Sequence, residues 1–287
     1  MADNHETAFV SLTNDLLFHM VFTRNSEALK ALLSSLLNIP ETYILRVEVL
    51  NPMQYSEIID TKLTVLDLKV HLNDNTFVHV EMQVRKFMYW TNRTVGYACR
   101  QIADQIHADF DYGKLEPVIQ VSIMDYSLFP DHKRFFKRYL PCDDEGYVYT
   151  DKLQFLVMDL TQIDGASQQQ KKQGLVEWAR AFRASSWEEV NEIDNPGVKE
   201  AAKTMQLIMS NPTEREMIRM RQDAHRDEIT LIADAERRGE ERGEKRGEKR
   251  GAELEKRETA KRMKEDGMDY ALIVKYTGLS VEDIEKL

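Results

Sequence analysis

Three polar side chains of types that hold metals and water lie in one short stretch, "TVLDLKVHLNDNTFVHVEMQ". Apolar and polar residues alternate along two runs, as in strands with one buried face. Asp67 lies on the first run, and Glu81 and Gln83 lie on the second. Carboxylates are oxygen ligands that suit Mg²⁺ or Mn²⁺ and not zinc, and the Gln83 amide can orient water or a phosphate oxygen. The stretch is therefore a candidate metal site.

The pairing of the two runs follows from a three-residue loop, Asn73–Asp74–Asn75. Such loops commonly end in a left-handed residue, which asparagine tolerates. Leu72 then pairs with Thr76, which gathers the apolar residues on one face and puts Asp67 opposite Glu81 on the other. A two-residue turn would place each acid opposite a core residue, so the burial pattern excludes it.

The facing acids have two explanations. Directly opposed residues have Cβ atoms about 4.5–5.5 Å apart, and two carboxylates at that distance repel unless one is protonated or a cation bridges them. A metal site explains the pair. An exposed sheet face, on which Asp67 and Glu81 interact with Lys69 and Arg85, explains it at least as well, because exposed acids are common. The residues alone leave both explanations open.

The surrounding patterns indicate the elements that would position this hairpin. Helices are expected from Asp15, over 26–38 with Ser26 as cap, and over 87–113, and strands over 44–51, 64–72, 76–84, 117–126 and 152–160. From residue 168 onward the patterns are helical. This order of elements predicts an α/β or α+β core with a helical C-terminal half.

The charged tail contains an internal repeat with glycines at 239, 243, 247 and 251. Each glycine costs a helix interior about 1 kcal/mol relative to alanine. At a spacing of four the glycines form one helical stripe between an arginine row and a glutamate row, which suits a seam between two copies. A solvated, partly helical tether explains the repeat equally well.

Beyond the repeat, the C-terminal segment has the rhythm of a helix-turn-helix, with a capping pattern from Ser280 to Asp283. Its last helix carries mostly acidic residues, the wrong sign for contact with phosphates. We therefore expect a packing or assembly module in place of a DNA reader.

Composition limits the class of protein. The chain has 287 residues, of which 42% are hydrophobic and 31% charged, with a net charge of −10. This acidity argues against a generally basic nucleic-acid binder but allows a local basic groove. Cys99 and Cys142 are too far apart in sequence to suggest a disulfide framework or zinc site. With neither a signal-peptide pattern nor a membrane-length apolar run, a soluble cytoplasmic protein is expected.

The segment with "LDLKV", "VEMQ" and "RKFMYWTNRTVGY" resembles the PD-(D/E)XK nuclease superfamily, and most closely its recombination-promoting nuclease and transposase branch (Rpn). The N-terminal "NDLLFHMVF" is similar to that branch's opening helix, with His19 where lysine is usual. The resemblance implies an α/β fold with a restriction-endonuclease-like mixed sheet flanked by helices and followed by a helical C-terminal region. The expected parts are a nuclease-like core over 1–165, a helical region over 166–235, a repeat helix or tether over 236–258, and a small helical module over 259–287.

The resemblance also implies roles for the hairpin residues. Asp67 and Glu81 would be metal ligands, with the Met82 carbonyl as a third candidate, and Gln83 would stand where the superfamily usually has lysine. Glutamine lacks the positive charge of lysine, but it can still position an attacking water. The auxiliary candidates are Asp15, which could equally cap or flank its helix, and Arg93, which could contact a phosphate. Lys69 is a further candidate because it shares the strand face of Asp67, although the family pattern does not give it a role.

The implied reaction is hydrolysis of DNA phosphodiester bonds with Mg²⁺, or Mn²⁺ in its place, linked to recombination or mobile elements. The expected partners are DNA and further copies of the chain, as a homodimer or larger homo-oligomer formed through the C-terminal region, without a membrane. A protein of another class also fits: a nuclease-fold assembly or regulatory protein with little or no activity. The net acidity, the missing lysine and the self-complementary tail favour that alternative.

Overall fold

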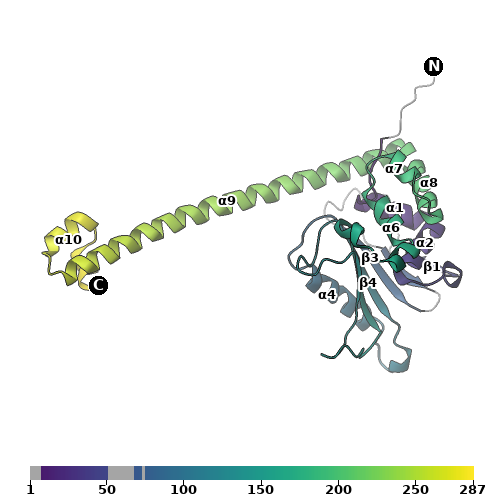
Figure 1. Cartoon of the computed structure of the whole chain (residues 1–287), viewed down its shortest axis with the longest axis horizontal. Helices are drawn as coiled ribbons and strands as arrows, with labels where there is room; N and C mark the ends of the chain where they lie inside the picture. Colours follow the sequence, from purple (N-terminus) through teal and green to yellow (C-terminus); the bar gives the residue numbers. More distant parts are fainter. Residues whose placement is uncertain (1–7, 51–67, 73–74) are drawn as a thin grey trace, which may run out of the picture. The chain divides into compact units, whose positions relative to one another are not determined.

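Among the described residues, a mixed six-stranded sheet forms the centre of the unit Met1–Gln222 (Figure 1). The computed structural model describes residues 8–50, 68–72 and 75–287. The strands run in the order β1 (Val47–Val49), β2 (Leu68–Leu72), β3 (Phe77–Gln83), β4 (Val118–Met124), β6 (Leu153–Asp159) and β5 (Phe136–Tyr139). The neighbouring strands β3, β4 and β6 are parallel, and β1, β2 and β5 pair antiparallel with their neighbours.

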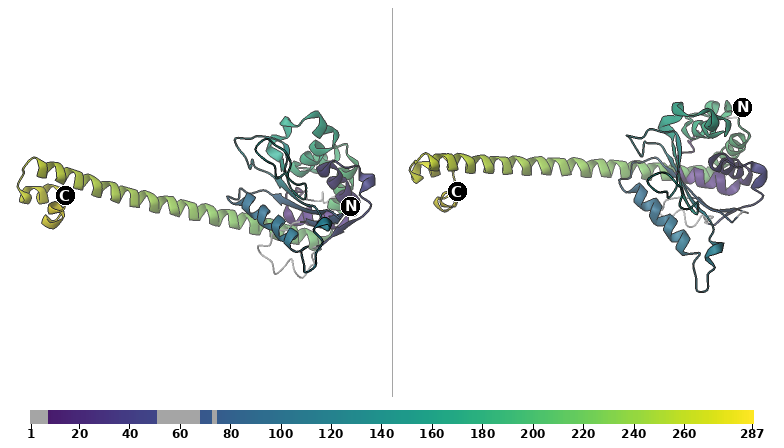
Figure 2. Two further views of the ribbon diagram at one scale, coloured as in Figure 1. Left: turned by 90° about the horizontal axis from the view of Figure 1, so that it is seen from below. Right: turned by 60° about the horizontal axis from the view of Figure 1, so that its bottom comes forward.

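Helices cover both faces of this sheet, which confirms the predicted α/β fold (Figure 2). The larger layer contains α1 (Asp15–Arg24), α2 (Ser26–Leu37), α6 (Leu175–Arg183) and α8 (Pro196–Ser210). The opposite face carries α4 (Trp90–Ala103). The other elements of the described residues are η1 (Glu41–Tyr43), η2 (Tyr112–Lys114), η3 (Leu160–Gly165), α5 (Gln168–Lys172), α7 (Trp187–Asn191), α9 (Pro212–Glu265), α10 (Tyr270–Thr277) and α11 (Val281–Glu285).

The described part of the hairpin has the predicted register. The Cα partners include Leu68 with Val80 and Val70 with Val78, and the backbone N–H of Leu72 donates to the Thr76 carbonyl at 3.0 Å. Asn75 has a φ of 62°, the left-handed conformation expected at the end of the loop. The predicted pairs that involve Leu66 and Asp67 lie outside the described residues.

The main core lies between the sheet and the larger helical layer. Alternate residues of β2 and β3 enter it, because side chains of a strand point to opposite faces in turn. Aromatic rings from α1 and α6 complete it: Phe22 lies 5.8 Å from Trp178, and Trp178 stacks on Phe182 at 6.0 Å. The helices of residues 175–210 therefore belong to the same hydrophobic core as the sheet.

Several element boundaries differ from the sequence predictions. Asn25, and not Ser26, caps α2: its side-chain oxygen accepts from the Ala28 N–H at 2.9 Å, while its amide donates to Thr204 of α8 at 2.8 Å. The strand expected over 44–51 is limited to Val47–Val49. Strand β5 was not predicted, because charged residues occupy its middle.

The helix predicted over 87–113 is also wrong in extent. It runs from Trp90 to Ala103, and Asp109 then adopts a left-handed φ of 66°. The chain turns because the side chain of Gln105 accepts from the backbone N–H of Glu116 at 2.9 Å. Gln105 and Glu116 are well separated in the sequence. The spacing of apolar residues along a helix therefore gives no sign of this hydrogen bond.

The chain divides into two compact units, Met1–Gln222 and Asp223–Leu287. The second contains a small core of Ala260, Ile273, Leu279 and Ile284. Ser280 caps α11 as predicted, accepting from the Asp283 N–H at 3.1 Å. None of the described helices is both long and apolar enough to cross a membrane.

Gly197, near the start of α8, provides a test of this packing. A Cβ atom there would lie 2.3 Å from the Ala31 Cβ and 3.0 Å from the Trp178 ring. We expect Gly197→Ala to lower the free energy of unfolding by about 1–3 kcal/mol, because neither neighbour can move freely. Urea unfolding of the full chain, followed by tryptophan fluorescence, measures the change, since all three tryptophans lie in the first unit.

The matched control is Gly96→Ala in α4, where an added Cβ meets nothing within 4 Å. This change should raise the free energy of unfolding by about 0.5–1 kcal/mol, because alanine favours a helix interior more than glycine does. A Gly197→Ala variant as stable as its Gly96→Ala counterpart would contradict the close packing of α8.

Candidate functional site

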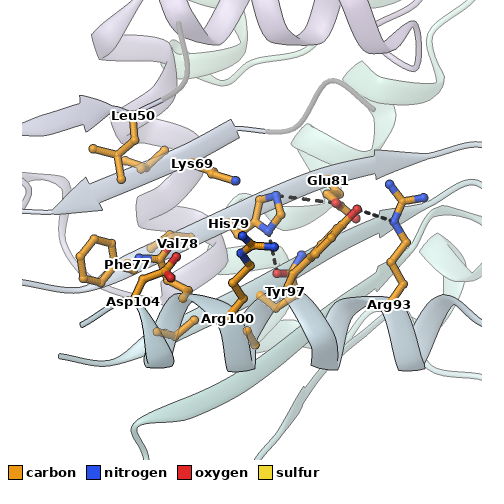
Figure 3. Close-up of a pocket in the computed structure, with 15 residues that line it drawn as sticks. Leu50, Lys69, Phe77, Val78, His79, Glu81, Arg93, Tyr97, Arg100 and Asp104 are labelled. Carbon is orange, nitrogen blue, oxygen red and sulfur yellow. Dashed lines mark hydrogen bonds and ion pairs between the residues drawn. The ribbon is translucent and has the colours of Figure 1, made fainter. Parts of the chain in front are cut away.

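The polar face of the hairpin is directed toward α4. Because Val70 and Val80 point into the main core, the alternate residues Lys69, His79 and Glu81 point to the other face. Figure 3 shows these three side chains between the strands and the α4 helix. The strand period therefore places one acid, one imidazole and one amine on the same surface.

A pocket of about 280 Å³ lies between this face and α4 (Figure 3). Strands β2, β3 and β4 form one wall and α4 forms the other. The charged and polar lining residues are Lys69, His79, Glu81, Arg93, Tyr97, Arg100, Gln101, Asp104 and Gln120. Three cationic side chains thus line the pocket together with two acids, so the lining is locally basic although the chain is acidic.

Glu81 is the deepest charged group of this pocket. It is 0% exposed, and the His79 Nε2 lies 3.6 Å from its Oε1. Transfer of an ionised carboxylate out of water is unfavourable unless nearby charges or hydrogen bonds compensate. His79 therefore gives the Glu81 carboxylate a polar neighbour at a position from which water is excluded.

His79 is in turn held by Gln120 of β4. The His79 Nδ1 and the Gln120 Oε1 are 2.8 Å apart, and both residues are buried. The His79 ring also lies 5.6 Å from the ring of Tyr97. With the amide oxygen as acceptor, Nδ1 is the donor, and a turned amide would reverse these roles. In either arrangement Gln120 fixes the imidazole that faces Glu81.

Arg93 reaches the pocket from α4. Its Nε donates to the Tyr97 hydroxyl at 2.8 Å. Its guanidinium carbon lies 5.2 Å from the centre of the Tyr97 ring and 5.8 Å from those of Phe87 and Trp90. Trp90 is anchored to the sheet, since its indole N–H donates to the Ser122 hydroxyl at 3.0 Å. These rings hold the guanidinium in one region, as cation–π contacts do.

Met82 and Gln83 follow Glu81 but do not line the pocket. The backbone N–H of Phe77 and the backbone carbonyl of Gln83 form hydrogen bonds on the side of β3 that faces β4. Because the backbone groups of successive residues in a strand alternate in direction, those of Met82 point toward β2. The Met82 side chain is buried in the main core. The Gln83 amide donates to the Arg85 carbonyl at 3.0 Å.

Asp15 has a different environment from the pocket residues. Its carboxylate binds Arg221 at the start of α9, with 2.5 Å between the Arg221 Nη2 and the Asp15 Oδ2. Asn14 caps α1. Asp15 flanks that cap, and the pocket lining does not include it. The structure thus brings together Glu81, Lys69 and Arg93 among the predicted residues, and it holds Asp15 against α9.

A second polar group lies where β4 and β6 end. Burial raises the pKa of the Asp125 carboxyl, with a further upward effect from Asp159 and an opposing one from Arg183. Burial also raises the pKa of the Tyr126 phenol, whose oxygen accepts from the Phe87 N–H at 3.3 Å. The Asp125 N–H donates to the Gln83 carbonyl at 3.0 Å, which joins this group to the end of β3.

Of the pocket residues that were not identified as site residues from the sequence, His79 and Gln120 form the polar chain next to Glu81. The available signals were weak: His79 shares a strand face with Glu81, and Gln120 interrupts the apolar run "PVIQVSIMDY". Asp67 lies outside the described residues. Within the described ranges, no group of three or more His, Cys, Asp or Glu is placed to hold a metal. A complete metal site at Glu81 thus requires further ligands, such as Asp67, a backbone carbonyl or water.

Comparison with known families gives a match over most of the chain. The model of the PD-(D/E)XK nuclease family transposases matches residues 12–235, which include the sheet, α4 and the pocket. Comparisons with curated proteins and with solved structures returned no significant match. The family match agrees with the mixed sheet and with the acid on β3, and the chain belongs to the PD-(D/E)XK nuclease family transposases.

Proposed function

We propose that this protein is a metal-dependent endonuclease that hydrolyses phosphodiester bonds of DNA, in a process linked to recombination or mobile elements. Family membership supports a nuclease-like, transposase-related role. The observation that carries the proposal is Glu81, a fully buried carboxylate that lines a pocket with three cationic side chains. Such a pocket suits a phosphate group next to a metal ion.

The donors present fit Mg²⁺, or Mn²⁺ in its place. Carboxylate and carbonyl oxygens are the ligands that these ions prefer. We infer that the described register continues by one pair, which would set Asp67 opposite Glu81, and that the Met82 carbonyl adds a third oxygen. When bound, the ion would supply a water of lowered pKa and neutralise charge that develops on the phosphate.

The other side chains have supporting roles in this proposal. Arg93 would hold a phosphate oxygen, because its guanidinium lines the pocket and is oriented by aromatic rings. Lys69 would add positive charge on the strand side of the pocket. His79 and Gln120 would keep the Glu81 carboxylate in place. Gln83 would position water, which requires that its amide leave the Arg85 carbonyl.

Glu81→Gln is the direct test. The amide keeps the shape of the side chain but removes the charge that holds a divalent ion. We expect cleavage of supercoiled plasmid with Mg²⁺ to fall by more than the about 10–100-fold typical of residues that only support a metal ligand. The fold should survive, since a neutral amide is easier to bury than a carboxylate. Gel assays of cleavage and circular dichroism measure the two effects.

The matched control is Asp104→Asn, which removes an acid from the rim of the same pocket. Its cleavage rate should stay near that of the unchanged protein. Full activity of Glu81→Gln would contradict the assignment. An unchanged protein that cuts no plasmid with Mg²⁺ or Mn²⁺ would instead favour an assembly or regulatory protein with an inactive nuclease fold.

We also infer that the protein forms a homodimer or larger homo-oligomer through the glycine repeat. Helix α9 continues through Gly239, Gly243, Gly247 and Gly251, and an added Cβ at any of them would meet nothing within 4 Å. A second helix could approach closely along this stripe, with arginine rows against glutamate rows.

Truncation after Ala235 should therefore lower the number of copies in the assembly, given by the molar mass from light scattering divided by the mass of the truncated chain. The sharper change is Gly243→Gln with Gly247→Gln, which fills the stripe while favouring the helix. Its control is Lys245→Gln, which lies on another side of the helix. A truncated chain with an unchanged number of copies would exclude the seam and leave the tether as the explanation of the repeat.

A further inference from the structure

Three consecutive apolar side chains are exposed between β3 and α4. Phe87, Met88 and Tyr89 are 41%, 83% and 61% exposed. We call these three residues the α4 wedge. Large apolar side chains at adjacent positions lose hydrophobic stabilisation when water surrounds them, and grouped exposure is typical of binding surfaces. The α4 wedge contributes little to the main core, which does not include it.

The identity of Tyr89 is also unfavourable for the helix that it begins. Tyr89 is the N-cap residue of α4, and its side chain makes no capping hydrogen bond. Asparagine, aspartate or serine at an N-cap stabilises a helix by about 1 kcal/mol relative to residues without a capping group. Asn14 and Asn25 serve that role for α1 and α2. Helix stability therefore does not account for an exposed tyrosine at this position.

Cationic groups connect the α4 wedge with the Glu81 pocket. The Arg93 guanidinium lies over the Phe87 ring of the wedge and over the Tyr97 ring of the pocket, at 5.8 and 5.2 Å. Lys86 precedes the wedge and is exposed. A ligand that reaches Glu81 along α4 thus meets positive charge and aromatic faces together.

We propose that the α4 wedge binds DNA bases that have left the helical stack, while Lys86 and Arg93 contact the adjacent phosphates. Aromatic faces stack on unpaired bases of any sequence, and apolar wedges enter between base steps. Positive charge beside the wedge complements the phosphate backbone. DNA with locally unpaired bases is then a better ligand than fully paired DNA. The inference takes DNA as partner from the proposed function, but it does not require hydrolysis.

Binding of the full chain in EDTA tests the wedge separately from catalysis. The probes are a fluorescein-labelled DNA duplex and the same duplex with a central run of unpaired bases, and fluorescence anisotropy gives the dissociation constants. The variant is Met88→Ser with Tyr89→Ser. Its matched control is Tyr147→Ser with Tyr149→Ser. This variant removes two aromatic side chains that are 79% and 87% exposed elsewhere in the unit Met1–Gln222.

The wedge variant should weaken binding of the unpaired probe by about tenfold or more, because stacking contributes strongly for each base. Binding of the paired probe should change by less than about twofold, and the control variant should match the unchanged protein. Lys86→Gln should weaken binding of both probes and reduce the dependence on salt, as expected for a phosphate contact.

Three results of the binding assay would overturn the proposal. They are equal affinity of the unchanged protein for both probes, an equal loss of affinity for both probes in the wedge variant, and a loss in the control variant equal to that in the wedge variant. A wedge variant with a lower molar mass in light scattering would also overturn it, since the surface would then join two copies. If the Glu81→Gln variant still cleaved plasmid, only the proposed reaction would be rejected. The proposed role of the α4 wedge would stand, because the preference for unpaired DNA is measured without metal.

Discussion

The burial of one face of the β2–β3 hairpin is the constraint on which the rest of the site depends. Leu68 and Val70 pair with Val80 and Val78, and all four are excluded from water. A shift by one residue would exchange the two faces and expose these side chains. The hydrophobic free energy of the core therefore determines that Glu81 faces α4, although Glu81 itself gains nothing from the core. The position of Glu81 is thus a consequence of side-chain packing on the opposite face of the hairpin.

A buried acid at this position carries an energetic consequence. Glu81 lies in the wall of the sheet, where water is excluded, and its neighbours His79 and Gln120 form a chain of polar contacts with β4. The protein maintains this arrangement against the desolvation of the carboxylate. Sites of function commonly contain such locally unfavourable groups, supported by the stability of the surrounding structure. The extensive core on the other face of the sheet supplies that support.

Sequence reasoning succeeded where a local pattern determines the structure. The hairpin register and the left-handed Asn75 followed from strict alternation and turn chemistry. Asp67 and Glu81 could be assigned a role as metal ligands only through family resemblance. The alternation of a strand does not distinguish a metal ligand from an exposed acid. The pattern also gave no sign of where Asp15 would lie, since its partner Arg221 is 206 residues away.

Failures of prediction arose where distant contacts override periodicity. The apolar spacing of the long helix pattern continues past Ala103, but the contact between Gln105 and Glu116 turns the chain there. Strand β5 was missed because Lys137 and Arg138 interrupt the apolar pattern, and pairing with β6 makes it a strand. His79 and Gln120 form a site contact only because parallel pairing brings β3 and β4 side by side.

The two edges of the sheet have a consequence for how the protein meets other molecules. The edge strand β1 has three residues, and β5 has four, with two exposed basic side chains at its centre. Short and charged edges offer few free backbone groups to an incoming strand, a common protection against unwanted sheet growth. Recognition by strand addition is thus disfavoured at both ends, and contacts with partners fall to helices and loops. In the part of the chain that the structure describes, the sheet edges are thus poorer surfaces for association than the helices and loops around them.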